Sequence, residues 1–429
     1  MHFDEPIPTK AAHALATDGS RVARWGFLPF IRCDIVTKKI RRKHGKLEEK
    51  EKVRPICYAA HKDAAIYSYY GHLLSTRYEA ELASGNLSQF VTAFRPASGK
   101  CNIDFALEAF DAIKAAMGCV ALAFDVEGFF DNLDHAILKQ QWCRLLNVQR
   151  LSADHFAVFR SLTRFATVRR EALFEALGIS PHNPRAGERK RLCAPEVFRK
   201  DVRDAGLVVV HKDSKGIPQG SPASAVLSNI YMLDFDKAVS ERVAAVGGFY
   251  RRYCDDFLCV VPASAASAVE AFVMETVTGL KLTINADKTK RHTFSIVNGR
   301  LTVAPEPLQY LGFLFDGRRV LIRTASIARY YRKLRAGVRF AALTKAKYDK
   351  LAAKRGVVNG PLKTRQLNLR YSYVGRHNFV SYAHRAARKM DDESLKSQIK
   401  PHWKKLNAEV QKANQRLTSS ATSLQTKQP

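Results

Sequence analysis

Two adjacent carboxylates, Asp255 and Asp256, stand between two apolar half-strands in the segment FYRRYCDDFLCVV, residues 249–261. Aromatic and β-branched residues on both sides predict a strand–turn–strand unit. Neighbouring charges on a buried hairpin repel each other and lose hydration, so a cation must compensate them. A divalent hard metal, which binds oxygen ligands, is the cation we expect. A third carboxylate, Asp125, ends the apolar run 120–124 and completes a candidate metal site.

The chain must bring Asp125 and Asp255 together across 130 residues of sequence. Adjacent strands of a sheet lie about 4.8 Å apart, so we expect both acids on neighbouring strands of one sheet. Residues 216–236 predict a bent loop rich in Gly and Pro that feeds a helix, with Ser221 or Ser224 as the cap.

Helical periodicity is found in residues 61–82, in 102–117 with Asn102 as a plausible N-cap, and in much of 136–176. Residues 178–200, rich in Pro, Arg and Gly, predict an irregular loop. Beyond residue 320 the chain is helical and basic, and the tail 418–429 is expected to lack structure. Strands beside helices predict an α+β fold.

The net charge of +30 implies a large polyanionic partner, of which nucleic acid is the first choice. Residues 317–429 hold 27 Lys and Arg against five Asp and Glu, so most of the excess lies in the last quarter. The length of 429 residues favours two or three subdomains. The charge run at residues 38–50 suits either a solvated face or a contact with the partner.

The eight cysteines form no CxxC pair and have no His cluster nearby, so a zinc site is not expected. Reduced thiols indicate a cytoplasmic protein. The N-terminus has no signal-peptide core, and no apolar run is long enough for a membrane span.

Six motifs occur in a fixed order and together resemble the palm of reverse transcriptases. They are KxRPI from Lys52, FDxxxFFD from Phe124, GIPQGSPxS from Gly216, YCDDF from Tyr253, LKLTINADKTK from Leu280 and LQYLGFLF from Leu308. The resemblance covers about residues 50–320. It implies a right-hand polymerase with an antiparallel palm sheet and a helical C-terminal thumb. The expected division is an N-terminal extension with fingers at 1–115, a palm at 116–320 with an insertion at about 137–215, and a thumb with tail at 321–429.

Carried over residue by residue, the resemblance makes Asp125, Asp255 and Asp256 the catalytic acids. Together with the backbone carbonyl of Val126, they would hold two Mg²⁺ ions. Nucleotidyl transfer needs a deprotonated primer hydroxyl and a neutralised pyrophosphate, and two metal ions about 3.5–4 Å apart provide both.

The resemblance also assigns nucleotide-binding and primer-gripping roles. Lys52 and Arg54, on one side of a short strand, would grip the triphosphate, although surface charge is the alternative. Gln219 would line the nucleotide pocket, Phe130 would exclude the ribose 2′-hydroxyl, and Lys288 is a possible proton donor to pyrophosphate. The alternatives are a hydrogen bond within the loop for Gln219, a core aromatic for Phe130 and a helix-end lysine for Lys288. Leu311, Gly312 and Phe313 match the primer grip, whereas Tyr253 and Cys254 are expected to be packing and turn residues.

Arginines interleaved with tyrosines suit phosphates and unstacked bases. The candidate nucleic-acid contacts are Arg251, Arg252, Arg370, Arg376, Arg385 and Arg388. The alternative for the C-terminal four is a helical thumb whose charges are merely solvated.

Two of these motifs look most like those of bacterial defence-associated reverse transcriptases of type 2. Their sequences are GIPQGSPASAVLSNIYM and YRRYCDDF. This resemblance implies a cytoplasmic bacterial enzyme that uses dNTPs to copy a noncoding RNA template into cDNA during phage infection. Two alternatives stay open: an intron maturase or RNA-binding scaffold, and template-independent synthesis primed on the protein. The oligomeric state is left open.

Overall fold

The computed structural model describes residues 1–43, 46–95, 98–286, 288–357 and 360–425, with side chains for all of these except 39–43, 46–48, 50 and 419–425. The chain forms two compact units, each assembled from separate segments. The first comprises Met1–Pro96, Phe124–Cys259 and Ala265–Lys290, and the second comprises Ala97–Ala123, Val260–Ser264 and Arg291–Pro429. Strands β3 (Cys119–Asp125) and β7 (Asp256–Val261) run from one unit into the other.

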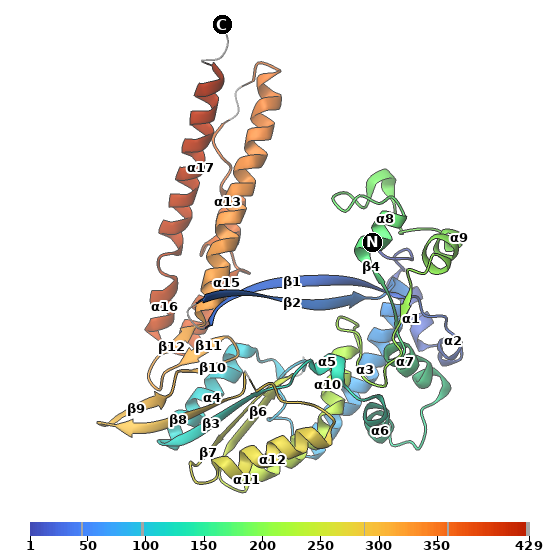
Figure 1. Cartoon of the computed structure of the whole chain (residues 1–429), viewed down its shortest axis with the longest axis vertical. Helices are drawn as coiled ribbons and strands as arrows, with labels where there is room; N and C mark the ends of the chain where they lie inside the picture. Colours follow the sequence, from blue (N-terminus) through green and yellow to red (C-terminus); the bar gives the residue numbers. More distant parts are fainter. Residues whose placement is uncertain (44–45, 96–97, 287, 358–359, 426–429) are drawn as a thin grey trace. The chain divides into compact units, whose positions relative to one another are not determined.

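The first unit contains many helices (Figure 1). They are α1 (Thr9–Thr17), α2 (Gly19–Ala23), α3 (His61–Ser84), α5 (Phe129–Asn132), α6 (His135–Leu145), α7 (Ala153–Thr163), α8 (Arg170–Ala176), α9 (Pro195–Val197), α10 (Ser224–Tyr231), α11 (Leu233–Ala244) and α12 (Ala266–Gly279), with a 3₁₀ turn at Ala186–Glu188 and a π-helical turn at Phe198–Asp204. The predicted helices at 61–82 and within 136–176 are confirmed.

A long antiparallel hairpin, β1 (Phe30–Lys43) and β2 (Lys46–Tyr58), belongs to a sheet of order β2-β1-β4-β5 in the same unit (Figure 1). The other two strands are β4 (Ala166–Arg169), which is parallel to β1, and β5 (Val209–Val210). Lys38 Nζ lies 2.6 Å from Glu49 and 3.3 Å from Glu51 across the hairpin. The strand carrying Lys52 is therefore much longer than the short one expected.

The sheet that carries the candidate acids has the order β6-β7-β3-β8-β9. Its other strands are β6 (Phe249–Tyr253), β8 (Lys290–Val297) and β9 (Arg300–Ala304). Two residues join β6 to β7, a connection that only antiparallel strands permit. The strand–turn–strand prediction is thus confirmed, and β3, which ends at Asp125, is the direct neighbour of β7 as expected.

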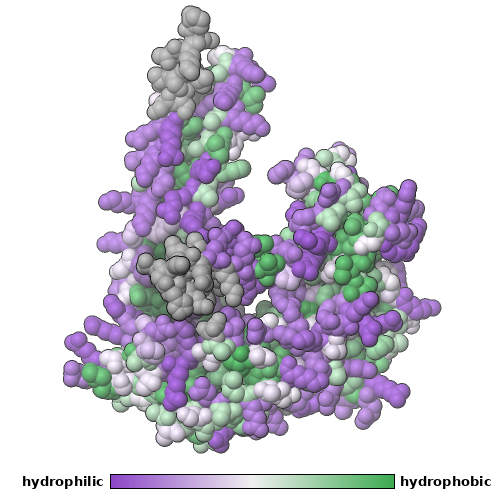
Figure 2. Space-filling view, viewed as in Figure 1, coloured by the Kyte–Doolittle hydropathy of each residue, from purple (hydrophilic) through white to green (hydrophobic). Residues whose placement is uncertain are grey.

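The second unit contains α4 (Asn102–Ala116), the antiparallel three-stranded sheet β10-β11-β12 and five C-terminal helices. Its strands are β10 (Leu308–Tyr310), β11 (Phe313–Phe315) and β12 (Val320–Ile322), and its helices are α13 (Thr324–Ala353), α14 (Arg365–Tyr371), α15 (Phe379–Lys389), α16 (Glu393–Ile399) and α17 (His402–Gln425). Helix α13 packs against α17, and hydrophilic side chains cover much of both helices on the face seen in Figure 2. The backbone remains helical to Gln425, so the expected lack of structure is wrong for residues 418–425, while residues 426–429 lie outside the described residues.

Two helix caps differ from expectation. Helix α4 begins at Asn102 and is capped by Cys101, so Asn102 is the first helical residue and not the cap. Helix α10 has no side-chain cap: Ser224 Oγ donates to the Pro218 carbonyl at 2.6 Å, and the Ser221 hydroxyl is buried without a partner.

The mixed helices and antiparallel sheets confirm the α+β fold class. Within the described residues, no helix has both the length and the apolar character that crossing a membrane requires.

Candidate active site

The turn between β6 and β7 consists of Cys254 and Asp255. Cys254 adopts a left-handed backbone with φ of 61°, which a tight two-residue turn requires. The Cys254 thiol is buried, and burial raises its pKa well above the ordinary value, so it stays protonated. Cys254 is therefore a turn residue, as expected, and it presents the two acids that follow it.

Backbone hydrogen bonds tie this turn to the end of β3. The Val126 N–H donates to the Asp255 carbonyl at 3.2 Å, and the Asn285 N–H donates to the Asp125 carbonyl at 2.8 Å. Asp256 is exposed, yet partial desolvation, then the charges of Asp255 and Asp125, raise its pKa to about 7. The structure thus brings the three predicted acids together, and their negative charges act on one another.

Lys288 is the cation next to this cluster. Its ammonium forms an ion pair with Asp125, whose side chain is largely buried, while the Lys288 side chain is 39% exposed. Lys288 was predicted as a nucleotide-binding residue, and the structure places its charge directly at the acids. This ion pair lies within the first unit and partly neutralises the cluster.

Within the described ranges, no three His, Cys, Asp or Glu side chains converge in a way that could hold a metal ion. The expected ligand set of Asp125, Asp255 and Asp256 is accordingly not preassembled around one point.

The loop before α10 approaches β2 closely. Gly220 has φ of 108°, and a Cβ there would lie 2.5 Å from the Cys57 carbonyl oxygen. The Cys57 N–H donates to the Gln219 carbonyl at 2.7 Å. Only glycine fits at residue 220 because a side chain would collide with backbone. The half-buried Gln219 is thereby fixed beside the end of β2.

Phe130, on α5, belongs to the same neighbourhood. It is half-buried, and its carbonyl accepts from the Ile217 N–H at 2.9 Å. Burial raises the pKa of Asp131, while the charges of Arg32 and Lys52 act to lower it, so Lys52 lies within electrostatic reach of α5. Lys52 and Arg54 are both exposed. Arg32, which was not predicted from the sequence to lie near this site, also donates from Nε to Asp34 at 2.7 Å.

Arg252 corrects a prediction. It was expected to contact nucleic acid, but its side chain is completely buried. Its guanidinium donates to both oxygens of Asp236, at 2.7 and 2.6 Å, and to Asn229 Oδ1 at 3.2 Å. It also donates to the Cys254 carbonyl at 3.1 Å. Arg252 therefore positions the turn that carries the acids and is not available to a polyanion.

The other arginine contacts remain exposed or half-exposed. Arg251 lies 4.3 Å from the ring centre of Phe249 and is half-exposed. In the second unit, Arg370, Arg376, Arg385 and Arg388 are all exposed.

The predicted primer grip forms a tight hairpin between β10 and β11. Leu311 and Gly312 have φ of 45° and 94°, and the Arg323 N–H donates to the Gly312 carbonyl at 3.0 Å. Phe313 is buried, whereas Leu311 and Gly312 are half-exposed. Asn102 Nδ2 donates to the Leu311 carbonyl at 3.1 Å. The hairpin shape expected from the sequence is confirmed.

Comparison with protein families shows to which family the chain belongs. The family model described as "Reverse transcriptase (RNA-dependent DNA polymerase)" matches residues 41–315, more than half of the chain. The chain belongs to the reverse transcriptase family. RNA-directed DNA polymerase is therefore its enzyme class, as predicted. No curated protein matches this reverse transcriptase.

Solved structures similar to this reverse transcriptase include yeast telomerases. Apo telomerase from Candida tropicalis, truncated from the C-terminal domain, is 13% identical with a TM-score of 0.42, covering 68% of this chain and 57% of that one. Telomerase from Candida albicans, in complex with a TWJ fragment of telomeric RNA, is 13% identical with a TM-score of 0.41, covering 97% and 62%. This chain spans less than two thirds of the length of either telomerase.

Proposed function

We propose that this reverse transcriptase copies a bound noncoding RNA into cDNA by nucleotidyl transfer with two Mg²⁺ ions, in antiphage defence of a bacterium. The observation that carries the polymerase part is the electrostatic interaction between Asp125, at the end of β3, and Asp255 and Asp256, in the turn before β7 and at its first residue, on the neighbouring strand of the same sheet. Fingers at 1–115, a palm at 116–320 and a thumb at 321–429 belong to the same proposal.

The donor set at the acids suits a hard divalent cation. All candidate ligand atoms are oxygens, from three carboxylates and the Val126 carbonyl, which is the chemistry that Mg²⁺ prefers. Desolvation and then the charges of Asp255 and Asp125 raise the pKa of Asp256, Lys288 offsets this only in part, and a divalent cation relieves this type of repulsion. When bound, the ions would activate the primer 3′-hydroxyl and neutralise the leaving pyrophosphate.

The side chains around the acids have separate tasks in this proposal. Lys52 and Arg54 bind the triphosphate of the incoming dNTP, because their positive charges are exposed and can contact phosphate oxygens. Gln219 lines the nucleotide pocket, and Phe130 lies against the sugar and excludes a 2′-hydroxyl. Lys288 exchanges its contact with Asp125 for the pyrophosphate, to which its Nζ donates a proton.

The proposed RNA template and the proposed role in defence are supported by the charge distribution and the sequence motifs, and not by the catalytic acids. The basic C-terminal quarter favours a retained polyanion, and the likeness of the loop and turn motifs to defence-associated enzymes favours a dedicated noncoding RNA. Arg251, Arg370, Arg376, Arg385 and Arg388 are the proposed contacts to this RNA and to the cDNA product.

The test is to purify the protein with the RNA that it retains, add Mg²⁺ and labelled dNTPs, and sequence the product. We expect cDNA complementary to one co-purified RNA. Asp255→Asn/Asp256→Asn should abolish synthesis, and Asp213→Asn, which neutralises an exposed acid of the same unit, should not. Product without a template match would favour protein-primed synthesis, and RNA retention without product would favour a scaffold; either outcome overturns the proposal.

A further inference from the structure

The second unit contains a pocket of about 480 Å³ at the start of helix α15. Three arginines and two tyrosines are prominent in its lining: Arg376, Arg385, Arg388, Tyr373 and Tyr382. Ligand pockets of this size enclose small molecules or single groups of a larger ligand. Its lining is cationic and aromatic, which is the composition of sites for unpaired nucleotides.

The three arginines carry unneutralised charge. Lys389, the next basic residue on α15, forms an ion pair with Asp104. In the described part of the chain, no carboxylate forms an ion pair with Arg376, Arg385 or Arg388, and all three are exposed. Guanidinium groups bind phosphate oxygens in bidentate fashion, so the pocket is prepared for an anion.

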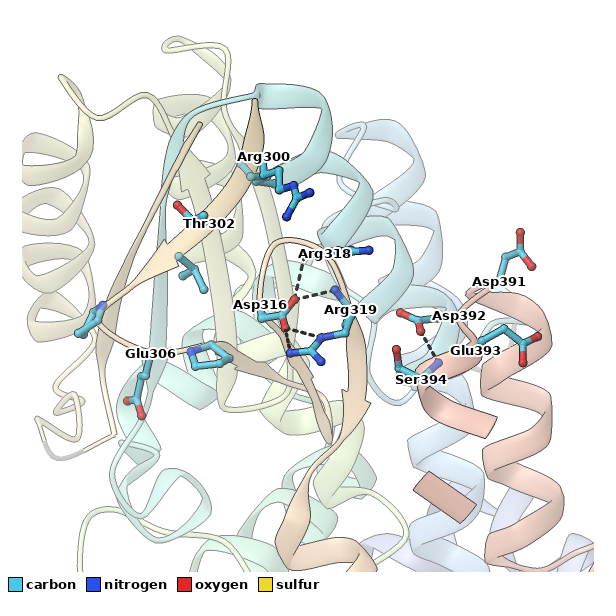
Figure 3. Close-up of a pocket in the computed structure, with 14 residues that line it drawn as sticks. Arg300, Thr302, Glu306, Asp316, Arg318, Arg319, Asp391, Asp392, Glu393 and Ser394 are labelled. Atoms are coloured by element: carbon cyan, nitrogen blue, oxygen red, sulfur yellow. Dashed lines mark hydrogen bonds and ion pairs between the residues drawn. The ribbon is translucent and has the colours of Figure 1, made fainter. Parts of the chain in front are cut away.

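A larger pocket in the same unit has a mixed lining, in which carboxylates outnumber the three arginines Arg300, Arg318 and Arg319 (Figure 3). There, Asp316 accepts hydrogen bonds from the Arg318 and Arg319 N–H groups and pairs with the Arg319 guanidinium at 3.0 Å. The carboxylates of Asp391 and Glu393 also line it. Since acids repel a polyanion, the smaller pocket is the better candidate for phosphate.

The backbone that carries Arg376 is held in place. Ser381 Oγ donates to the Arg376 carbonyl at 2.8 Å, and Asn378 Nδ2 donates to the carbonyls of Leu369 and Ser372 at 2.9 and 2.7 Å. A Cβ at Gly375 would lie 1.8 Å from the Leu369 oxygen, so the loop depends on glycine there. A fixed loop lowers the entropic cost of binding at the pocket.

The tyrosines offer a surface for a base and a link to the primer grip. Tyr373 is 60% exposed, and its ring centre lies 5.3 Å from that of Trp403, which supports it from one side. The Tyr382 hydroxyl accepts from Asn102 Nδ2 at 2.8 Å, and the same nitrogen donates to the Leu311 carbonyl. One asparagine therefore joins the pocket wall to the primer-grip turn.

We propose that this pocket binds one unpaired nucleotide of the RNA template, with its phosphate on Arg385 and Arg388 and its base against Tyr373. A paired and stacked base cannot enter a cavity of this kind without leaving its duplex. The proposal rests on the proposed function only in taking the bound strand to be the template.

The test measures binding of a fluorescein-labelled single-stranded RNA, and of the same RNA as a duplex, by anisotropy without Mg²⁺ or dNTPs. The pocket variant is Arg385→Gln/Arg388→Gln. Its matched control, Arg332→Gln/Arg335→Gln, removes two exposed charges of α13 that lie outside the pocket lining. Tyr373→Ala tests the base contact, and circular dichroism verifies folding of each variant.

We expect the pocket variant to lose about tenfold more affinity for single-stranded RNA than its control, with equal losses for duplex. The salt dependence should fall by about 0.7 in log–log slope for each phosphate contact removed. Tyr373→Ala should weaken single-strand binding by about fivefold or more. Equal losses in both arginine variants, no effect of Tyr373→Ala, or displacement of the RNA by equimolar AMP would overturn the proposal.

The assay separates this proposal from the polymerase assignment because it involves no synthesis. The same differences should appear in an Asp255→Asn/Asp256→Asn background. If synthesis survives that background, the catalytic assignment fails while the pocket result stands.

Discussion

Replacing Arg252 by methionine should destabilise the fold strongly, although the sequence suggested that this arginine contacts nucleic acid. Both side chains of the Arg252–Asp236 pair are fully buried, at 2.6 Å separation. Removing the guanidinium leaves Asp236 charged in the interior with the Tyr250 hydroxyl, at 2.7 Å, as a remaining donor. Breaking such a pair costs about 3–5 kcal/mol, a large share of the roughly 5–15 kcal/mol that stabilises a typical domain.

Urea unfolding measures this loss, and two further variants sharpen it. Arg252→Lys keeps the charge but loses the bidentate geometry, so we expect a smaller loss of about 1–3 kcal/mol. Arg252→Met/Asp236→Leu removes both charges and should recover much of the stability of the single variant. It should not recover polymerase activity, because the hydrogen bond from Arg252 to the Cys254 carbonyl is still missing. A loss below about 1 kcal/mol for Arg252→Met, typical of exposed ion pairs, would refute this reasoning.

Two other perturbations follow from the same unit. Phe130→Ala should allow incorporation of ribonucleotides, measured as the ratio of rNTP to dNTP use, and unchanged discrimination would make Phe130 a packing residue only. Burial raises the pKa of Asp63 to about 6, above its unfolded value near 4, so its proton stabilises the folded state at low pH. This contribution should decline as pH rises from about 4 to 6, and Asp63→Asn should remove that decline from unfolding curves measured across this range. A pH dependence identical to that of the parent would contradict the assignment to Asp63.

The catalytic strands could be predicted because their evidence is local. Apolar and aromatic residues flank Asp255 and Asp256 within a few positions, and a strand–turn–strand unit is the simplest structure that such a pattern permits. The pairing of β3 with β7 is not local, but Asp125 follows the same kind of apolar run. Similar chemistry at two strand ends indicated that the strands are neighbours.

The partners of charged side chains could not be predicted in the same way. Arg252 is buried because Asp236, sixteen residues earlier, lies opposite it on α11. The length of the β1–β2 hairpin depends on a register that places Lys38 near Glu49 and Glu51, and this register is invisible in a one-dimensional charge run. One clue was available: Tyr250 and Arg252 share a face of β6, and that face is the buried one.

The acids of the first unit differ in how their negative charge is balanced. Burial acts to raise the pKa of Asp134, but the Lys281 ammonium and the N–H groups at the start of α6 outweigh it, and the pKa is lowered. Asp236 is likewise satisfied, by Arg252 and Tyr250. Asp63 accepts from Trp25 Nε1 and the Leu28 N–H, and burial still raises its pKa to about 6, so a raised pKa by itself does not mark a functional acid in this fold. Asp256 differs because, after desolvation, two neighbouring carboxylates, Asp255 and Asp125, raise its pKa to about 7, and a bound cation would relieve that repulsion.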